Sequence, residues 1–95
     1  MGNIVINPET RATTLDGKEV ALTGKEFDLL LFLASHPGQV FTRDQLMDRV
    51  WDYSFAADAS TVTVHIRRIR EKVEADPMRP KYIKTVWGVG YKCEK

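Results

Sequence analysis

Residues 60–74 read STVTVHIRRIREKVE, and their periodicity is the starting point for inferring the fold. Its apolar residues recur at helical spacing: Val62, Ile66, Ile69 and Val73. At about 100° per residue, such spacing places all of them on one face of an α-helix. The pattern therefore predicts an amphipathic helix over residues 60–75 that buries this face and stops before Asp76-Pro77.

The remaining surface of this helix carries basic and short side chains: Ser60, Thr63, Val64, His65, Arg67, Arg68, Arg70 and Lys72. Arginine can make two parallel hydrogen bonds to guanine and also binds phosphate. The short Thr63 and Val64 would let the backbone come close to base edges, and Val64 could meet a thymine methyl group. We therefore expect the helix to enter the major groove of DNA. Taken alone, such a basic cluster is more often a solvated helix face, and its place on a third helix before a basic hairpin is what favours DNA binding.

The first 22 residues are typical of a small antiparallel sheet. Residues 4–6 (IVI) form a short apolar run that Asn7-Pro8 ends. Asp16-Gly17 is a two-residue hairpin signal, and it joins residues 11–15 to residues 18–22.

Two further helices are expected before residue 60. Thr23 with Glu26, and Thr42 with Gln45, both follow the capping-box pattern that starts a helix. The first helix runs from about Gly24 to the breaker at residues 36–38. Its expected buried stripe consists of Phe27, Leu30, Leu31 and Ala34. The second helix continues through Leu46 and Val50 to Trp51, and residues 52–58 form a loop before the basic helix.

The C-terminal segment returns to β structure. Residues 82–86 and 90–93 flank a bend in which Gly88 and Gly90 permit positive φ, so a hairpin is the natural interpretation. Lys84 and Lys92 would neutralise DNA phosphates, while Trp87 is either exposed at the tip or packed on its own hairpin. The fold class is therefore α+β, a winged helix-turn-helix whose wing, at about residues 82–93, lies at the minor groove.

Charge is distributed unevenly along the chain. Residues 1–58 hold 5 basic and 9 acidic side chains (net −4), whereas residues 59–95 hold 9 basic and 4 acidic ones (net +5). The basic part is where a polyanion would bind. The whole chain is expected to be one domain of 95 residues, without a membrane span or signal peptide, and Cys93 as the single cysteine fits the cytoplasm.

Four segments together resemble the effector domain of OmpR/PhoB-type response regulators: LTGKEFDLLLFLASHPG (22–38), VFTRDQLMDRVW (40–51), STVTVHIRRIREKVE (60–74) and YIKTVWGVGYK (82–92). The resemblance implies a winged helix with a four-stranded N-terminal sheet. It also implies a transcription factor with a receiver domain upstream, a sensor kinase, and head-to-tail pairs on direct-repeat DNA. The loop of about residues 52–58, with Asp52, Tyr53, Ser54, Phe55 and Asp58, would contact RNA polymerase.

The resemblance also assigns individual residues. His65, Arg67, Arg68 and Arg70 match positions that face DNA or its phosphates, Val64 matches a base-contacting position, and Thr85 matches a wing position near phosphate. Three residues depart from the common pattern: Ser60 and Trp87 replace arginines, and Thr63 replaces an aspartate. Base preference therefore cannot be transferred from a relative.

Other functions remain open at this point. A winged helix could instead bind an acidic protein partner, or belong to a membrane-anchored one-component regulator. An enzyme is not expected, because the sequence holds no nucleophile with a base, no phosphate-binding loop and no metal cluster. No cofactor is expected, and the isolated domain is predicted to be a monomer that pairs only on DNA.

Overall fold

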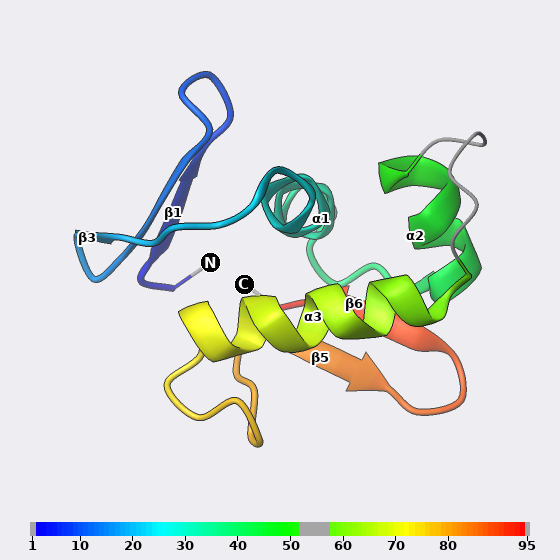
Figure 1. The fold of residues 1–95 in the computed structure, drawn as a ribbon. Helices are drawn as coiled ribbons and strands as arrows, with labels where there is room; N and C mark the ends of the chain where they lie inside the picture. Colours follow the sequence, from blue (N-terminus) through cyan, green and yellow to red (C-terminus); the bar gives the residue numbers. More distant parts are fainter. Residues whose placement is uncertain (1, 52–57, 95) are drawn as a thin grey trace.

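The computed structural model describes residues 2–51 and 58–94. The elements follow in the order β1 (Ile4–Asn7), β2 (Ala12–Leu15), β3 (Lys18–Glu19), α1 (Gly24–Ala34), β4 (Phe41–Thr42), α2 (Arg43–Val50), α3 (Ser60–Val73), β5 (Ile83–Val86) and β6 (Gly90–Cys93). The helix α1 lies between the N-terminal sheet and α2, and α3 lies along the β5–β6 hairpin (Figure 1). The predicted α+β order of sheet, three helices and hairpin is confirmed.

The N-terminal sheet has the antiparallel order β1-β2-β3. Asp16 and Gly17 form the expected two-residue turn with φ of 53° and 80°, so the hairpin prediction is confirmed. The third strand is shorter than predicted, and the described residues give three strands here where the resemblance implied four. Val20 still donates to the carbonyl of Thr13, but the chain then leaves the sheet because Thr23 must cap α1.

Both predicted capping boxes are present. The Oγ1 of Thr23 accepts from the Glu26 amide at 3.3 Å, and the Glu26 carboxylate accepts from the Thr23 amide at 3.0 Å. Thr42 and Gln45 make the equivalent pair at 3.0 and 2.8 Å. Each cap contributes about 1 kcal/mol and fixes the residue at which its helix begins.

The apolar stripe of α3 is buried as predicted, with Val62, Ile66, Ile69 and Val73 all inaccessible to solvent or nearly so. The stripe predicted for α1 is partly wrong: Leu29 and Leu33 are fully buried, whereas Leu31 and Ala34 are only half-buried. The reason is that α1 packs against α2, α3 and β6 together, so that more than one of its faces is covered.

The wing belongs to a second sheet with the order β4-β6-β5. The two-residue strand β4 was not predicted, because so short a segment carries no periodic signal. It explains Gly90, whose added Cβ would lie 1.9 Å from the Phe41 carbonyl oxygen, so close approach and not positive φ requires glycine there. Gly88 alone has positive φ, 78°, in the turn closed by the Val89 amide and the Val86 carbonyl.

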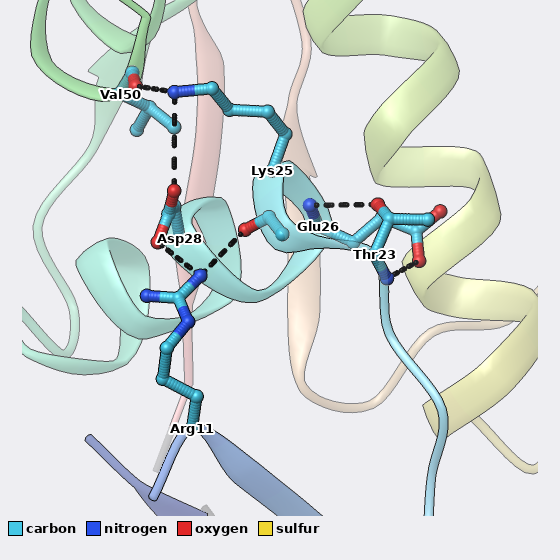
Figure 2. A network of polar contacts seen from close by, with 7 residues as sticks. Arg11, Thr23, Lys25, Glu26, Asp28 and Val50 are labelled. Atoms are coloured by element: carbon cyan, nitrogen blue, oxygen red, sulfur yellow. Dashed lines mark hydrogen bonds and ion pairs between the residues drawn. The ribbon is translucent and has the colours of Figure 1, made fainter. Parts of the chain in front are cut away.

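A polar network ties the start of α1 to its neighbours (Figure 2). Arg11 bridges from the N-terminal sheet to Asp28 at 2.9 Å and to the Gly24 carbonyl at 3.1 Å. Lys25 donates to the carbonyl of Val50, the last residue of α2, at 3.0 Å. Such exposed contacts add little stability each, but together they fix where α1 sits between the sheet and α2.

Candidate nucleic-acid interface

The outer face of α3 presents two arginines to solvent. Arg67 and Arg68 are exposed, as is Thr63 one turn earlier, while Val64 is half-buried. Among the described residues, neither guanidinium has a hydrogen-bond or ion-pair partner. The predicted outward direction of both arginines is therefore confirmed, and their donors are available to an external acceptor.

The wing reaches the same surface because β5 runs antiparallel to α3 (Figure 1). A groove between the two is lined by Arg43, Thr63, Thr85, Trp87 and Val89, among others. Trp87 is 89% exposed, which excludes packing of its indole on its own hairpin. Arg43, an exposed cation at the start of α2, was not singled out from the sequence, where nothing indicated that α2 begins beside the wing.

Arg70 has partners inside the molecule. Its Nε and Nη2 donate to the Ile83 carbonyl at 3.2 and 2.9 Å, and Nη2 also donates to Thr85 Oγ1 at 2.8 Å. The guanidinium lies 5.7 Å from the centre of the Tyr91 ring. Burial lowers the pKa of Arg70, with Tyr91 and Glu74 opposing, yet arginine stays charged. Contacts of Arg70 and Thr85 with DNA stay predictions.

Lys72 and His65 are likewise engaged. The Nζ of Lys72 lies 2.6 Å from the carboxylate of Glu26, which is 1% exposed. Burial raises the pKa of Glu26, but hydrogen bonds from Lys72 and Thr23 and the nearby charges of Lys72 and His65 lower it more, so the net shift is downward. His65 Nδ1 lies 2.8 Å from the Thr61 carbonyl oxygen, and its ring meets Trp51 edge-on at 5.0 Å.

The N-terminus of α3 is capped by Asp58. The cap residue Ala59 has no side-chain acceptor, but the Oδ1 of Asp58 accepts from the Ser60 amide at 2.9 Å and from the Ser60 hydroxyl. These bonds lower the pKa of Asp58. The sequence placed Asp58 only in the polymerase-contacting loop. The other residues of that prediction, Asp52, Tyr53, Ser54 and Phe55, lie outside the described residues.

The C-terminus of α3 is fixed by a buried glutamate that sequence reasoning missed. Glu74 ends the helix two residues before the predicted boundary, and its side chain turns towards β5. The carboxylate accepts from the amides of Lys81, Tyr82 and Ile83 at 2.8 to 3.2 Å. A glutamate at a helix end ordinarily indicates an exposed side chain, so the sequence carried no signal for this role.

The two wing lysines, Lys84 and Lys92, are half-buried. Lys92 pairs with Glu94 at 3.0 Å, and Lys84 lines a second groove together with Met78 and Trp87. Within residues 2–51 and 58–94, no cluster of three or more His, Cys, Asp or Glu side chains could hold a metal ion. In that same part of the chain, no helix is both long enough and apolar enough to cross a bilayer.

Comparison with known proteins identifies the family of the chain. The family described as "Transcriptional regulatory protein, C terminal" matches residues 17–93. The chain is 48% identical over 93 residues to the DNA-binding response regulator MtrA of Mycolicibacterium smegmatis, covering 98% of this chain and 41% of MtrA. It is 44% identical over 95 residues to the alkaline phosphatase synthesis transcriptional regulatory protein PhoP of Bacillus subtilis, covering 100% of this chain and 40% of PhoP. The chain thus spans about two fifths of the length of these relatives.

Solved structures agree. The response regulator DrrB of Thermotoga maritima, described as an OmpR/PhoB homolog, has a TM-score of 0.93 at 41% identity, with 100% of this chain and 43% of DrrB covered. The RstA DNA-binding domain of Klebsiella pneumoniae, solved in complex with the RstA box, has a TM-score of 0.87 at 35% identity, with 98% and 92% covered. The chain therefore belongs to the family of C-terminal domains of transcriptional regulatory proteins, and it has the winged-helix fold of OmpR/PhoB-type response regulators.

Proposed function

We propose that this chain is the effector domain of a two-component response regulator and binds double-stranded DNA at specific sequences. The observation that carries the proposal is the pair Arg67 and Arg68, exposed and without partners among the described residues, on a helix flanked by an exposed wing. MtrA and DrrB are response regulators, and the RstA DNA-binding domain was solved on its DNA box. Control of transcription by such DNA binding is the activity that fits these features together.

In the proposed complex, α3 lies in the major groove, whose width of about 12 Å accepts one α-helix. Arg67 and Arg68 supply the donors for guanine edges or phosphates, and Thr63 lies near the N-terminal end, where the backbone approaches the bases. Arg43 and Lys84, on the two sides of the wing, neutralise phosphates without reading sequence.

The wing tip contacts the minor groove by shape and not by charge. Trp87 and Val89 are 89% and 52% exposed, and the turn between Val86 and Gly90 carries no ionisable side chain. An indole packs against sugar walls through its apolar surface but supplies no cation to the groove. We therefore expect the wing to contribute affinity that depends weakly on salt.

The proposal extends to partners of the full-length protein. A receiver domain precedes this domain, a sensor kinase controls it, and two copies bind direct repeats head to tail while the isolated domain is a monomer. Residues 52–58 contact RNA polymerase. This role needs no cofactor or catalytic group, and it would place the protein in the cytoplasm, where the DNA of a two-component system lies.

Selection of bound duplexes from a random pool tests the function. We expect one motif, with half-sites repeating about one helical turn apart. Binding should weaken as salt rises, with log K falling by about 0.9 per neutralised phosphate for each unit of log salt. Lys18→Ala is the control, since Lys18 is an exposed cation on the N-terminal sheet, away from α3.

Two outcomes of this selection would contradict the proposed function or part of it. Lack of enrichment, together with no duplex affinity at low salt, would reject DNA binding and favour the use of the basic face against an acidic protein. A motif without repeated half-sites would reject only the head-to-tail arrangement.

A further inference from the structure

The strand β5 is an edge of the wing sheet, and α3 covers that edge. Within residues 2–51 and 58–94, the order β4-β6-β5 pairs only one side of β5 with another strand. An edge strand leaves backbone amides and carbonyls without partners. The side chains of α3 satisfy two of these groups on one residue, because Glu74 accepts from the Ile83 amide at 2.9 Å and Arg70 donates to the Ile83 carbonyl at 2.9 Å.

The contacts extend in both directions from Ile83. Glu74 also accepts from the amides of Lys81 and Tyr82, which lead into β5, while Arg70 reaches Thr85 further along the strand. Arg70 and Glu74 are four residues apart, so both lie over the same stretch of β5. We call the two side chains with these bonds the α3–β5 clasp.

The clasp joins the two elements that are proposed to touch DNA. The wing turn follows directly on β5 and lies beside the N-terminal half of α3 (Figure 1). The Glu74 side chain is buried and charged, and a carboxylate that accepts several amides holds them in one geometry. A helix and a wing bind adjacent grooves together at a lower entropic cost if the angle and distance between them are fixed beforehand.

We propose that Arg70 and Glu74 are positioning residues. They hold the wing in place against α3, so that the major-groove and minor-groove contacts form together. This rests on the proposed function. It also gives Arg70 a role other than phosphate contact, since two of its three guanidinium nitrogens already donate within the protein.

Hydrogen exchange on the free 95-residue chain tests the first half of the proposal. In Glu74→Gln, the amides of Tyr82 and Ile83 should exchange about tenfold faster or more relative to the amides of Leu29 and Leu30 in α1, which record any loss of overall stability. Glu71→Gln, an exposed glutamate of the same helix, should change neither group. Unchanged protection at Ile83 in Glu74→Gln would overturn the clasp.

DNA binding tests the second half. The experiment uses two lengths of a duplex that the chain selects. The long duplex includes the flanking base pairs that the wing reaches. The short duplex lacks this flank, and it is truncated until the wild type and Trp87→Ala bind it with equal affinity. The ratio of short-duplex to long-duplex Kd measures the wing contact. Glu74→Gln should lower this ratio about fivefold to tenfold and leave short-duplex binding unchanged. Glu71→Gln should leave the ratio as it is.

A double variant distinguishes a positioning role from a general loss of DNA affinity. Because Glu74 acts through the wing, Glu74→Gln should cost nothing further on the long duplex once Trp87 is alanine. An equal loss on both duplexes, or additive losses in the double variant, would overturn the proposal while leaving DNA binding itself intact. Failure to select any duplex would instead reject the proposed function, and the positioning role with it.

Arg70→Gln separates positioning from phosphate contact. If Arg70 only positions the wing, this variant lowers the ratio but keeps the affinity and salt slope of the short duplex. A salt slope reduced by about 0.9 on the short duplex would show that Arg70 neutralises a phosphate there, and would overturn its assignment.

Discussion

The outer face of α3 and its flank beside β5 both carry basic side chains, but these side chains are exposed on the first and bonded within the protein on the second. Arg67 and Arg68 project into solvent without partners among the described residues. Arg70, two positions later, donates three hydrogen bonds to Ile83 and Thr85, and Lys72 pairs with the buried Glu26. Basic residues on one helix therefore divide into an exposed pair and a pair that holds other parts of the fold, according to the element that packs nearby.

Because of this division, the charge pattern of the sequence assigns more residues to the binding surface than the fold leaves available. The helical period orients each arginine around the α3 axis, but it does not say that β5 lies along one flank and α1 along another. Substitutions on the two sides should consequently affect different measurements. On the clasped flank they should change stability and the wing contact, and on the exposed face they should change direct DNA affinity without changing stability.

The largest effect is expected on the clasped flank, from Glu74→Ala. Loss of the carboxylate leaves the amides of Lys81, Tyr82 and Ile83 without their acceptor, and charged hydrogen bonds of this kind contribute substantially. We expect the free energy of unfolding in urea to fall by about 3 kcal/mol or more. Glu71→Ala, exposed on the same helix, should change it by less than about 0.5 kcal/mol. Similar values for the two variants would contradict the comparison.

On the free face, Arg68→Ala should weaken specific DNA binding by about 1–3 kcal/mol if the guanidinium reads a base. The unfolding free energy should stay within about 0.5 kcal/mol, because Arg68 is exposed and has no partner among the described residues. Titration of the selected duplex and urea denaturation measure the two effects separately. An intact affinity, or a large loss of stability, would remove Arg68 from the proposed interface.

The ion pair between Lys72 and Glu26 predicts that the stability of the fold depends on pH. The pKa of Glu26 is lowered from its ordinary value of 4.5, so ionisation of this carboxyl stabilises the folded state. The stabilisation is complete above about pH 4.5 and is lost as the pH falls through the lower folded pKa. Urea midpoints between pH 7 and pH 3 should therefore fall less in Glu26→Gln than in the wild type, and Lys72→Met should also reduce the fall. Parallel curves would show that the ion pair does not favour folding.

Much of the fold could be predicted from the sequence because its signals are local. The capping boxes at Thr23 and Thr42, the turn at Asp16-Gly17 and the apolar period of α3 each involve residues a few positions apart. What was missed depends on distant partners. The pairing of β4 with β6, the close approach at Gly90 and the burial of Leu29 arise only when separate segments pack together.

The candidate site follows the same rule. The outward direction of Arg67 and Arg68 was predicted correctly, since a helix face is local geometry, whereas the sequence left open whether Trp87 is exposed. Glu74 and Arg70 acquire their roles from β5, and Asp58 from the start of α3. No periodicity in the sequence indicates that an edge strand will lie beside a given turn of the helix.

The smallest expected effect is at Thr85, where the clasp meets the wing. Thr85→Val removes the oxygen that accepts from Arg70 Nη2 at 2.8 Å and nearly preserves the side-chain volume. Arg70 keeps the Ile83 carbonyl, so the loss should be only about 1 kcal/mol in unfolding free energy. Thr63→Val makes the same chemical change on the exposed face of α3 and should be neutral within about 0.5 kcal/mol. In an Arg70→Gln background the Thr85→Val change should cost less than in the wild type, because its partner is already gone. An undiminished cost would mean that the hydroxyl serves some other group than Arg70.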